Sequence, residues 1–148
     1  MQRTASTEDI APIVLVVDDD PDLTDLLSRF LSRQGIKTLV ALSGTQCLET
    51  VERRPDIDVI VLDVMMPGMD GLQVCATLRQ MKGASTIPII LLTARDDAST
   101  RLAGVELGVS DFVVKPTSGY HLVARIQAQV EARRKEQTID RQNLLCIK

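Results

Sequence analysis

The chain has 148 residues, of which 45% are hydrophobic and 25% charged, and its formal net charge is −3. This composition is ordinary for one globular domain with a sizeable core, and it argues against disorder. The mild negative charge gives no electrostatic reason for the domain to bind nucleic acid. No stretch approaches 18 apolar residues, so we expect no membrane association. Three cysteines without metal-ligand spacing favour reduced thiols in a cytoplasmic protein.

The first element predicted along the chain is a strand at residues 13–17. This continuous apolar run is typical of a strand that is buried on both faces of a parallel sheet. It ends abruptly at three consecutive aspartates. Asp20 followed by Pro21 predicts the start of a helix, with a carboxylate cap and a proline at the first helical position. Gly35 is expected to end that helix.

The same alternation of strand and helix repeats four more times. Further strands are predicted at residues 36–42, 57–62, 87–92 and 111–114. The helices that follow them are expected to start at Ser43, about Gly71, Asp96 or Asp97, and Thr117 or Ser118. Five alternations with short connections predict an α/β fold with a doubly wound parallel sheet, (βα)5, flanked by helices.

The two ends of the chain are more polar than its centre. We expect residues 1–11 to form a flexible N-terminal tail. Beyond about residue 133 the composition turns polar, and residues 134–148 are expected to be a helix extension or a linker. The basic run at residues 133–135 is interpreted as a solvated helix end, where cations suit the helix dipole.

Polar side chains stand where the apolar runs end, which is where sites form in an open α/β sheet. These residues are Asp18, Asp19, Asp63, Thr93 and Lys115. Two carboxylates about 4 Å apart repel by roughly 4 kcal/mol at an effective dielectric near 20. Lys115 offsets part of this repulsion, and a hard divalent cation would offset more. Oxygen ligands without His or Cys nearby suit Mg²⁺.

Acids, a lysine and a metal together predict phosphoryl chemistry at this edge of the sheet. An ionised carboxylate can attack phosphorus and form an aspartyl phosphate. The transfer then requires neutralisation of the phosphoryl oxygens, which Mg²⁺ and Lys115 would supply. The hydroxyl of Thr93 would donate a hydrogen bond to the new phosphate.

Four segments closely resemble the receiver domain of two-component response regulators. They are VLVVDDD, VLDVMMPGMDG, LLTA and DFVVKP, in the order and spacing of that family. The similarity covers roughly residues 12–133. It implies a flavodoxin-like fold with strand order 2-1-3-4-5, and a histidine kinase or histidine phosphotransfer protein as partner.

The resemblance also implies a role for each acid of the site. By position, Asp63 is similar to the phosphorylation site of the family. Asp19 and Asp63 are expected to bind Mg²⁺ directly, together with the main-chain carbonyl of Met65. Asp18 is expected to act on the metal through water.

The remaining site residues correspond to the family's switch. Thr93 and Phe112 resemble the switch pair, and Lys115 the lysine that contacts the phosphate. The Lys115–Pro116 bond is similar to one that is usually cis in the family. Phosphorylation is then expected to change the surface of the helix near residues 97–108, the strand at 111–114 and the last helix. That surface would serve an effector domain or a homodimer.

The implied function is a phosphorylation-activated signalling switch, not an enzyme that turns over outside substrates. One alternative is a Mg²⁺-dependent phosphohydrolase that forms an aspartyl phosphate. Such enzymes usually carry a second acid two residues past the nucleophile, where this chain has Met65.

Two further alternatives concern other kinds of protein. A flavodoxin-like carrier of FMN needs a Ser/Thr/Gly-rich loop and aromatic residues. The three aspartates at residues 18–20 and an aromatic content of 2% argue against it. Because no output motif follows residue 130, the chain is either a stand-alone receiver or the receiver module of a larger effector protein. The resemblance of its tail to the linker helices of such proteins favours the second.

Overall fold

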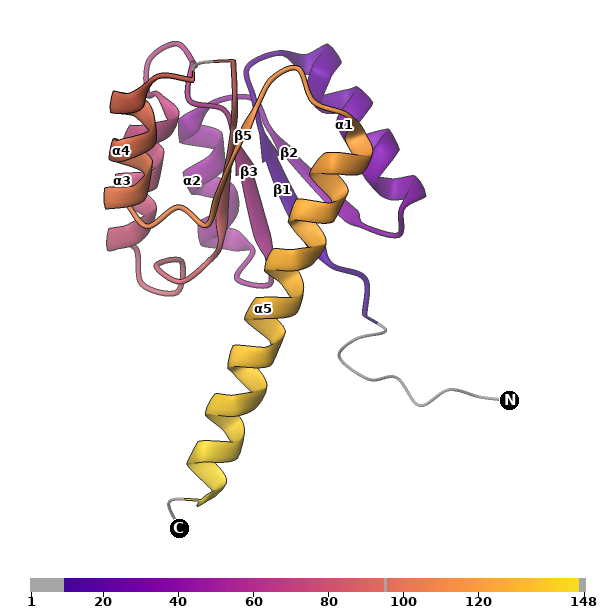
Figure 1. Cartoon of the computed structure of the whole chain (residues 1–148), viewed down its shortest axis with the longest axis vertical. Helices are drawn as coiled ribbons and strands as arrows, with labels where there is room; N and C mark the ends of the chain where they lie inside the picture. The colour runs from indigo at the N-terminus through magenta and orange to yellow at the C-terminus, as the bar shows by residue number, and fades with distance from the viewer. Residues whose placement is uncertain (1–9, 95, 147–148) are drawn as a thin grey trace.

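A computed structural model describes residues 10–94 and 96–146, with their side chains up to residue 137. The elements are β1 (Ile13–Val17), α1 (Pro21–Arg33), β2 (Lys37–Ala41), α2 (Gly44–Arg53), β3 (Val59–Leu62), α3 (Gly71–Gln80), β4 (Ile89–Thr93), α4 (Ala98–Glu106), β5 (Asp111–Val114) and α5 (Gly119–Cys146). The five strands are parallel and lie in the order β2-β1-β3-β4-β5. Figure 1 shows helices on both faces of this sheet, which confirms the predicted fold class and strand order.

Two apolar layers cover the two faces of the sheet. In β1, Leu15 and Val17 pack toward α2 and α3, whereas Val14 and Val16 pack toward α1 and α5. All four side chains are at most 1% exposed. Successive residues of a strand point to opposite faces, so a strand that is covered on both sides must be apolar throughout. This requirement accounts for the unbroken apolar runs that predict the strands.

The helix starts follow the predicted capping chemistry. The side chain of Asp20 accepts hydrogen bonds from the amides of Asp22 and Leu23 at the start of α1. Asp70 forms a capping box with Gln73 at the start of α3. Asp97, one of the two residues predicted for this role, caps α4. These short polar residues satisfy amide groups that have no partner within the helix.

Three strands begin later than the apolar runs that predict them. The run at residues 57–62 contains β3 from Val59 onward, and the run at 87–92 contains β4 from Ile89 onward. Ile57 and Ile87 precede the strands, yet both are almost completely buried. β2 likewise starts at Lys37 rather than at residue 36. A buried position favours an apolar residue whether or not it belongs to a strand. The apolar run therefore does not mark where the hydrogen-bonded pairing of the strands starts.

The last helix is better anchored than its basic run predicts. α5 continues to Cys146 and projects beyond the sheet in Figure 1. The interpretation of residues 133–135 as a solvated helix end is wrong for the first two. Arg133 donates to the carbonyl oxygens of Ile57 and Asp58 at 3.0 and 3.3 Å. Arg134 donates to the carbonyl oxygen of Ile10 and lies 3.8 Å from a carboxylate oxygen of Asp58.

The course of α5 explains why Arg133 and Arg134 have partners within the protein. α5 lies over the starts of β1 and β3, where carbonyl groups face the helix, so its arginines find partners that no local pattern reveals. Lys135, in contrast, is exposed. Residues 1–9 of the predicted N-terminal tail lie outside the described residues. Among the described helices, none has both the length and the apolar character needed to cross a bilayer.

The anchoring of α5 gives a prediction about stability. Arg133→Gln should lower the free energy of unfolding by about 1–3 kcal/mol, because it removes charged donors from two partly buried carbonyl groups. Lys135→Gln is the matched control, since Lys135 is exposed on the same turn, and it should change the stability by less than about 0.5 kcal/mol. Urea unfolding followed by circular dichroism measures both. Equal effects of the two substitutions would contradict the anchoring role.

Candidate functional site

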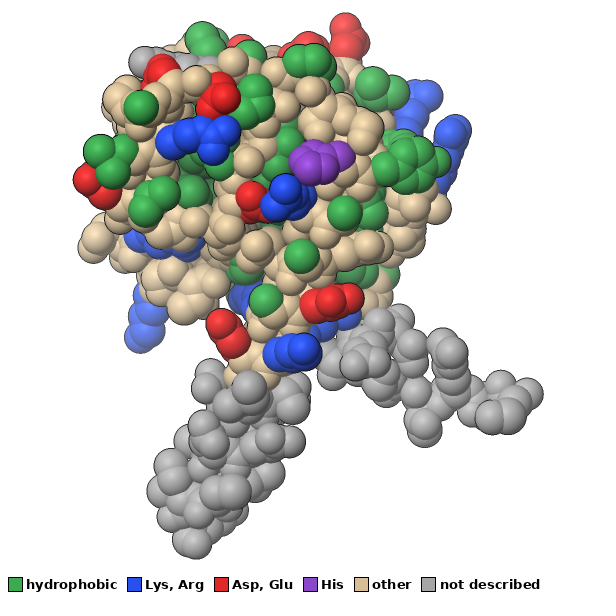
Figure 2. All heavy atoms as spheres, in the orientation of Figure 1, with side chains coloured by type: hydrophobic (Ala, Val, Ile, Leu, Met, Phe, Trp, Pro, Cys, Tyr) green, Lys and Arg blue, Asp and Glu red, His purple; other side chains and the backbone are tan. Residues whose placement is uncertain are grey.

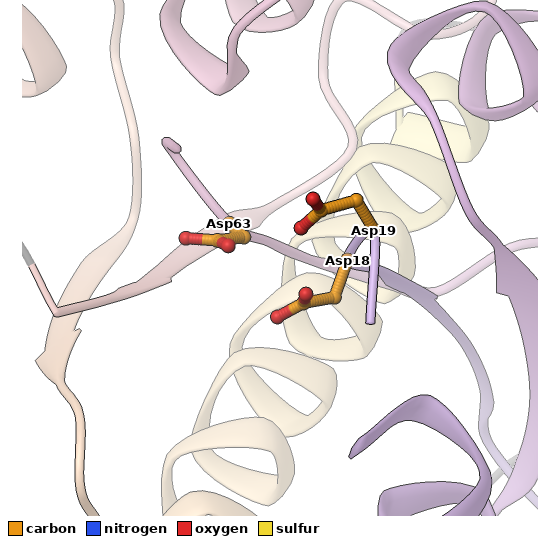
Figure 3. A group of neighbouring side chains, drawn as sticks. All are labelled: Asp18, Asp19 and Asp63. Atoms are coloured by element: carbon orange, nitrogen blue, oxygen red, sulfur yellow. The ribbon is translucent and has the colours of Figure 1, made fainter. Parts of the chain in front are cut away.

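The five predicted site residues come together at one edge of the sheet. Asp18 and Asp19 follow β1, Asp63 follows β3, Thr93 ends β4, and Lys115 follows β5. These four strands are neighbours in the sheet, and all run in the same direction. Figure 3 shows the aspartates of β1 and β3 side by side. The fold therefore places all five residues at the carboxyl ends of adjacent strands.

The three aspartates form a compact group of oxygen ligands. One carboxylate oxygen from each of Asp18, Asp19 and Asp63 lies within 4.8 Å of the other two. Asp18 and Asp63 are 4% and 6% exposed, whereas Asp19 is exposed to solvent. Oxygen donors alone, with one side open to water, fit a small hard cation such as Mg²⁺ that retains water ligands. The residues present therefore suit the metal that the sequence predicts.

Lys115 places a positive charge next to these aspartates. Its ammonium lies 2.6 Å from a carboxylate oxygen of Asp18 and 3.4 Å from one of Asp63. The Lys115–Pro116 bond is cis, as predicted. The amide of Lys115 donates to the carbonyl oxygen of Thr93, which ties the chain after β5 to the end of β4. One lysine thus contacts two of the three acids.

The loop after β3 brings a helix directly against the backbone of Asp63. A Cβ atom added at Gly71 would lie 2.3 Å from the carbonyl oxygen of Asp63 and 2.8 Å from the Cα of Val64, so only glycine fits. The amide of Gly71 donates to the carbonyl oxygen of Val64 at 2.9 Å. Gly68 provides the preceding turn with a φ of +79°. The two glycines of MPGMDG therefore fix the position of the acid.

Burial and neighbouring charges act in different directions on the Asp63 carboxyl. Burial raises the pKa of the Asp63 carboxyl above its ordinary value; the charge of Lys115 opposes this increase, and the charge of Asp18 adds to it. Burial lowers the pKa of the Lys115 ammonium, but its hydrogen bond to Asp18 and the charges of both acids outweigh this, so that the pKa is raised. A bound cation would lower the electrostatic cost of keeping these carboxylates ionised.

Met65, Thr93 and Phe112 are the residues to which the resemblance assigns further roles. The amide of Met65 donates to a carboxylate oxygen of Asp63 at 3.2 Å, and the Met65 side chain is 57% exposed. The side chain of Thr93 is fully buried. Phe112 is half-buried in β5, where it pairs with Leu91. The roles of these residues as ligand, switch and phosphate contact stay predictions.

Two contacts near the site are not foreseen from the sequence. One is the hydrogen bond from the Met65 amide to Asp63. The other is the guanidinium of Arg101, which lies 4.5 Å from the centre of the Phe112 ring. The spacing of 11 residues between a helix and a strand carries no recognisable pattern, so no sequence signal could have found it.

Comparison with known proteins shows where such a site occurs. Residues 14–127 match the model of the response regulator receiver domain. The chain is 42% identical over 124 residues to the "DNA-binding response regulator MtrA" of Mycolicibacterium smegmatis, which covers 83% of this chain and 52% of that protein. It is 43% identical over 128 residues to the "Transcriptional regulatory protein AfsQ1" of Streptomyces coelicolor, covering 86% and 55%. The chain thus spans about half the length of these relatives.

Solved structures agree with this family at the level of the fold. The chemotaxis protein CheY4 of Vibrio cholerae superimposes with a TM-score of 0.76 at 27% identity, covering 80% of this chain and 98% of that one. The BeF3-activated N-terminal receiver domain of RstA from Klebsiella pneumoniae superimposes with a TM-score of 0.72 at 30% identity, covering 80% and 97%.

The raised pKa of Asp63 gives a prediction about pH. An unfolded aspartate titrates near pH 3.9, and the folded one titrates higher. Between these two values the unfolded state has lost its proton while the folded state keeps it, so stability contributed by this group falls as the pH rises. The Asp63→Asn variant lacks this loss. Without metal, its advantage in unfolding free energy over wild type should therefore grow from about pH 3.9 upward and level off.

Urea unfolding in EDTA across this pH range tests the expectation. Added Mg²⁺ should reduce the advantage of Asp63→Asn at neutral pH, because the cation relieves the wild-type carboxylates. An advantage that is the same at every pH would show that Asp63 is not held in an unfavourable ionised form.

Proposed function

The chain belongs to the response regulator receiver domain family, and we propose that it accepts a phosphoryl group on Asp63 and changes its surface in response. The donor is a histidine kinase or a histidine phosphotransfer protein. The observation that carries the proposal is the group of three carboxylates within 4.8 Å of one another, two of them in contact with Lys115. Such a site has a deficit of positive charge that a cation would offset, and the cation and Lys115 would then balance the charge of a phosphoryl group.

In the transfer step, a carboxylate oxygen of Asp63 forms a bond to phosphorus. The phosphorus–nitrogen bond of the donor phosphohistidine breaks, and its electron pair stays on the imidazole nitrogen. Lys115 pairs with the phosphoryl oxygens and gives up part of its contact with the free carboxylates. The hydroxyl of Thr93 donates a hydrogen bond to the product phosphate. When bound, Mg²⁺ neutralises the charge that is spread over the phosphoryl oxygens.

The residues proposed to hold Mg²⁺ are Asp19, Asp63 and the main-chain carbonyl of Met65, with Asp18 acting through water. The exposure of Asp19 supports a direct role, because a cation that retains waters needs an open side. Asp18 already accepts hydrogen bonds from Lys115 and from the amide of Asp20, which supports an indirect role.

The signal is proposed to pass through Thr93 and Phe112. A hydrogen bond from Thr93 to the phosphate draws the end of β4 toward Asp63, and the ring of Phe112 rotates into the space that this movement leaves. The surface formed by α4, β5 and α5 changes shape as a result. The phosphate shifts the equilibrium between two packings because it binds one of them better.

The site supports a switch better than an enzyme. A phosphohydrolase would need an acid or base at position 65, where Met65 presents an exposed apolar side chain. An FMN carrier would need a neutral phosphate loop after β1, where Asp18 and Asp19 stand. Intrinsic gain and loss of the phosphoryl group are the only reactions that we propose.

The larger setting follows from the relatives. The full-length MtrA of M. smegmatis is named as a DNA-binding response regulator. We therefore propose that residues 12–133 are the receiver domain of a cytoplasmic effector protein, and that residues 134–148 form the helix that leads to an output domain. The receiver itself does not bind nucleic acid. The surface of α4, β5 and α5 contacts either that output domain or a second copy of the chain.

The first test of this function is chemical phosphorylation. Incubation with acetyl phosphate and Mg²⁺ should add one phosphoryl mass to the wild-type protein, and EDTA should abolish the addition. Asp63→Asn should remain unmodified, whereas Asp20→Asn should be modified like wild type, because asparagine also caps a helix. Intact mass spectrometry measures all three proteins. Modification of Asp63→Asn to the wild-type extent would place the acceptor elsewhere.

The second test concerns the metal. Asp19→Asn should weaken Mg²⁺ binding by about tenfold or more, because it removes an ionised ligand from the site. Asp20→Asn again serves as the control: its position in the sequence is adjacent, but its side chain caps α1 and should leave the affinity unchanged. Calorimetric titration with MgCl₂ gives both affinities. Equal losses in the two variants would indicate a general effect of charge and not a ligand role for Asp19.

A further inference from the structure

The guanidinium of Arg101 lies between an aromatic ring and a carboxylate. Its central carbon is 4.5 Å from the centre of the Phe112 ring, within the range of a cation–π contact. Its Nε donates a hydrogen bond to a carboxylate oxygen of Asp96. About half of the Arg101 side chain is exposed. Three elements meet in this contact: the segment before α4, α4 itself and β5.

The positions of the two partners connect this contact to the site. Asp96 lies three residues after Thr93, in the segment that joins β4 to α4. Phe112 lies in β5, next to Leu91 of β4. Asp96 thus follows the end of β4 closely in the chain, and its hydrogen bond with Arg101 connects this segment to the contact with the Phe112 ring.

The apolar side chains of α4 are only partly used in packing against the sheet. Two of its large apolar side chains face solvent, Leu102 at 60% and Val105 at 70% exposed. Figure 2 shows hydrophobic side chains at the surface over α4, beside acidic and basic ones. The helix backbone approaches the sheet closely at Gly104, where an added Cβ would lie 3.1 Å from the side chain of Leu91. Arg101 lies one turn earlier and makes the side-chain contact with β5.

We propose that Arg101 is a positioning residue that holds the ring of Phe112 in its half-buried position and so sets how readily the switch responds. The inference rests on the proposed function. Phosphorylation draws the end of β4 and Asp96 toward Asp63, which loosens the guanidinium from the ring and releases Phe112. The cation–π contact is present in the resting packing and is lost in the activated one. Any ligand that activates the protein must therefore overcome this contact.

The expected size of the effect follows from the strength of such contacts. At a half-exposed site, the loss of a cation–π contact should shift the equilibrium about two- to fivefold. Arg101→Gln should thus tighten the Mg²⁺-dependent binding of beryllofluoride, a stable stand-in for the phosphoryl group, by about two- to fivefold. Arg101→Lys keeps a cation but not its planar group, and it should lie between Arg101→Gln and wild type.

The chain offers a direct spectroscopic readout, because it contains only two phenylalanines. With fluorinated phenylalanine, ¹⁹F NMR gives one signal for Phe30 and one for Phe112, and Phe112→Leu assigns them. In ligand-free Arg101→Gln, the Phe112 signal should move part of the way toward its position in the beryllofluoride complex. Arg29→Gln is the matched control: Arg29 is an exposed arginine of α1 paired with Asp25, and its loss should move neither the signal nor the affinity.

A double-mutant cycle decides whether Arg101 acts through the ring. In the Phe112→Leu background, adding Arg101→Gln should leave the beryllofluoride affinity unchanged, and the result should be the same at two protein concentrations, which excludes an effect on self-association. An unchanged affinity in Arg101→Gln alone, or an equal change with and without the ring, would overturn this inference. If wild type shows no Mg²⁺-dependent binding of beryllofluoride, the proposed function itself is overturned, and the inference with it.

Discussion

The close grouping of the carboxylates of Asp18, Asp19 and Asp63 at one edge of the sheet is the constraint on which the site depends. Their carboxylate oxygens lie within 4.8 Å of one another, and one lysine stands against them. Lys115 lies closer to Asp18 than to Asp63, at 2.6 Å compared with 3.4 Å, so the acid at the end of β3 keeps the weaker compensation. Burial makes this shortage more costly. On the function proposed for this site, the lost stability accompanies the binding of a cation and then of a phosphoryl group.

The fold keeps these like charges close together although they repel one another. Parallel strands that are covered on both faces end at a common edge, and the chain must leave that edge through short loops. Gly71 lets α3 pack directly on the backbone of Asp63, and Asp20 caps α1 immediately after the acid pair. Clustering these charges costs folding free energy, and burial of the two apolar layers of the sheet offsets this cost. The buried apolar side chains of β1 and β3 belong to these layers.

Much of this organisation could be predicted from the sequence, for a physical reason. Strands that are buried on both faces demand continuous apolar runs, and their ends are marked by the first polar residue, which is how Asp63, Thr93 and Lys115 are recognised. Strand order came from the likeness of four motifs to a family and not from the periodicity of the residues. The contacts that several arginines make with distant parts of the chain escaped prediction. In the sequence, Arg133 and Arg134 belong to a short basic run that suggests no partner. They find their partners because α5 lies over the starts of β1 and β3. The contact of Arg101 with Phe112 depends in the same way on how α4 packs against β5.

The most direct test of this account is a crystal structure of the chain grown with Mg²⁺ and beryllofluoride. The account predicts a cation bound by Asp19, Asp63 and the carbonyl oxygen of Met65, and a beryllium atom bonded to a carboxylate oxygen of Asp63. Lys115 should contact a fluorine atom, and the ring of Phe112 should have left the guanidinium of Arg101. Density for the cation or for beryllofluoride at any other acid, with the carboxylates of Asp18, Asp19 and Asp63 unchanged, would contradict it.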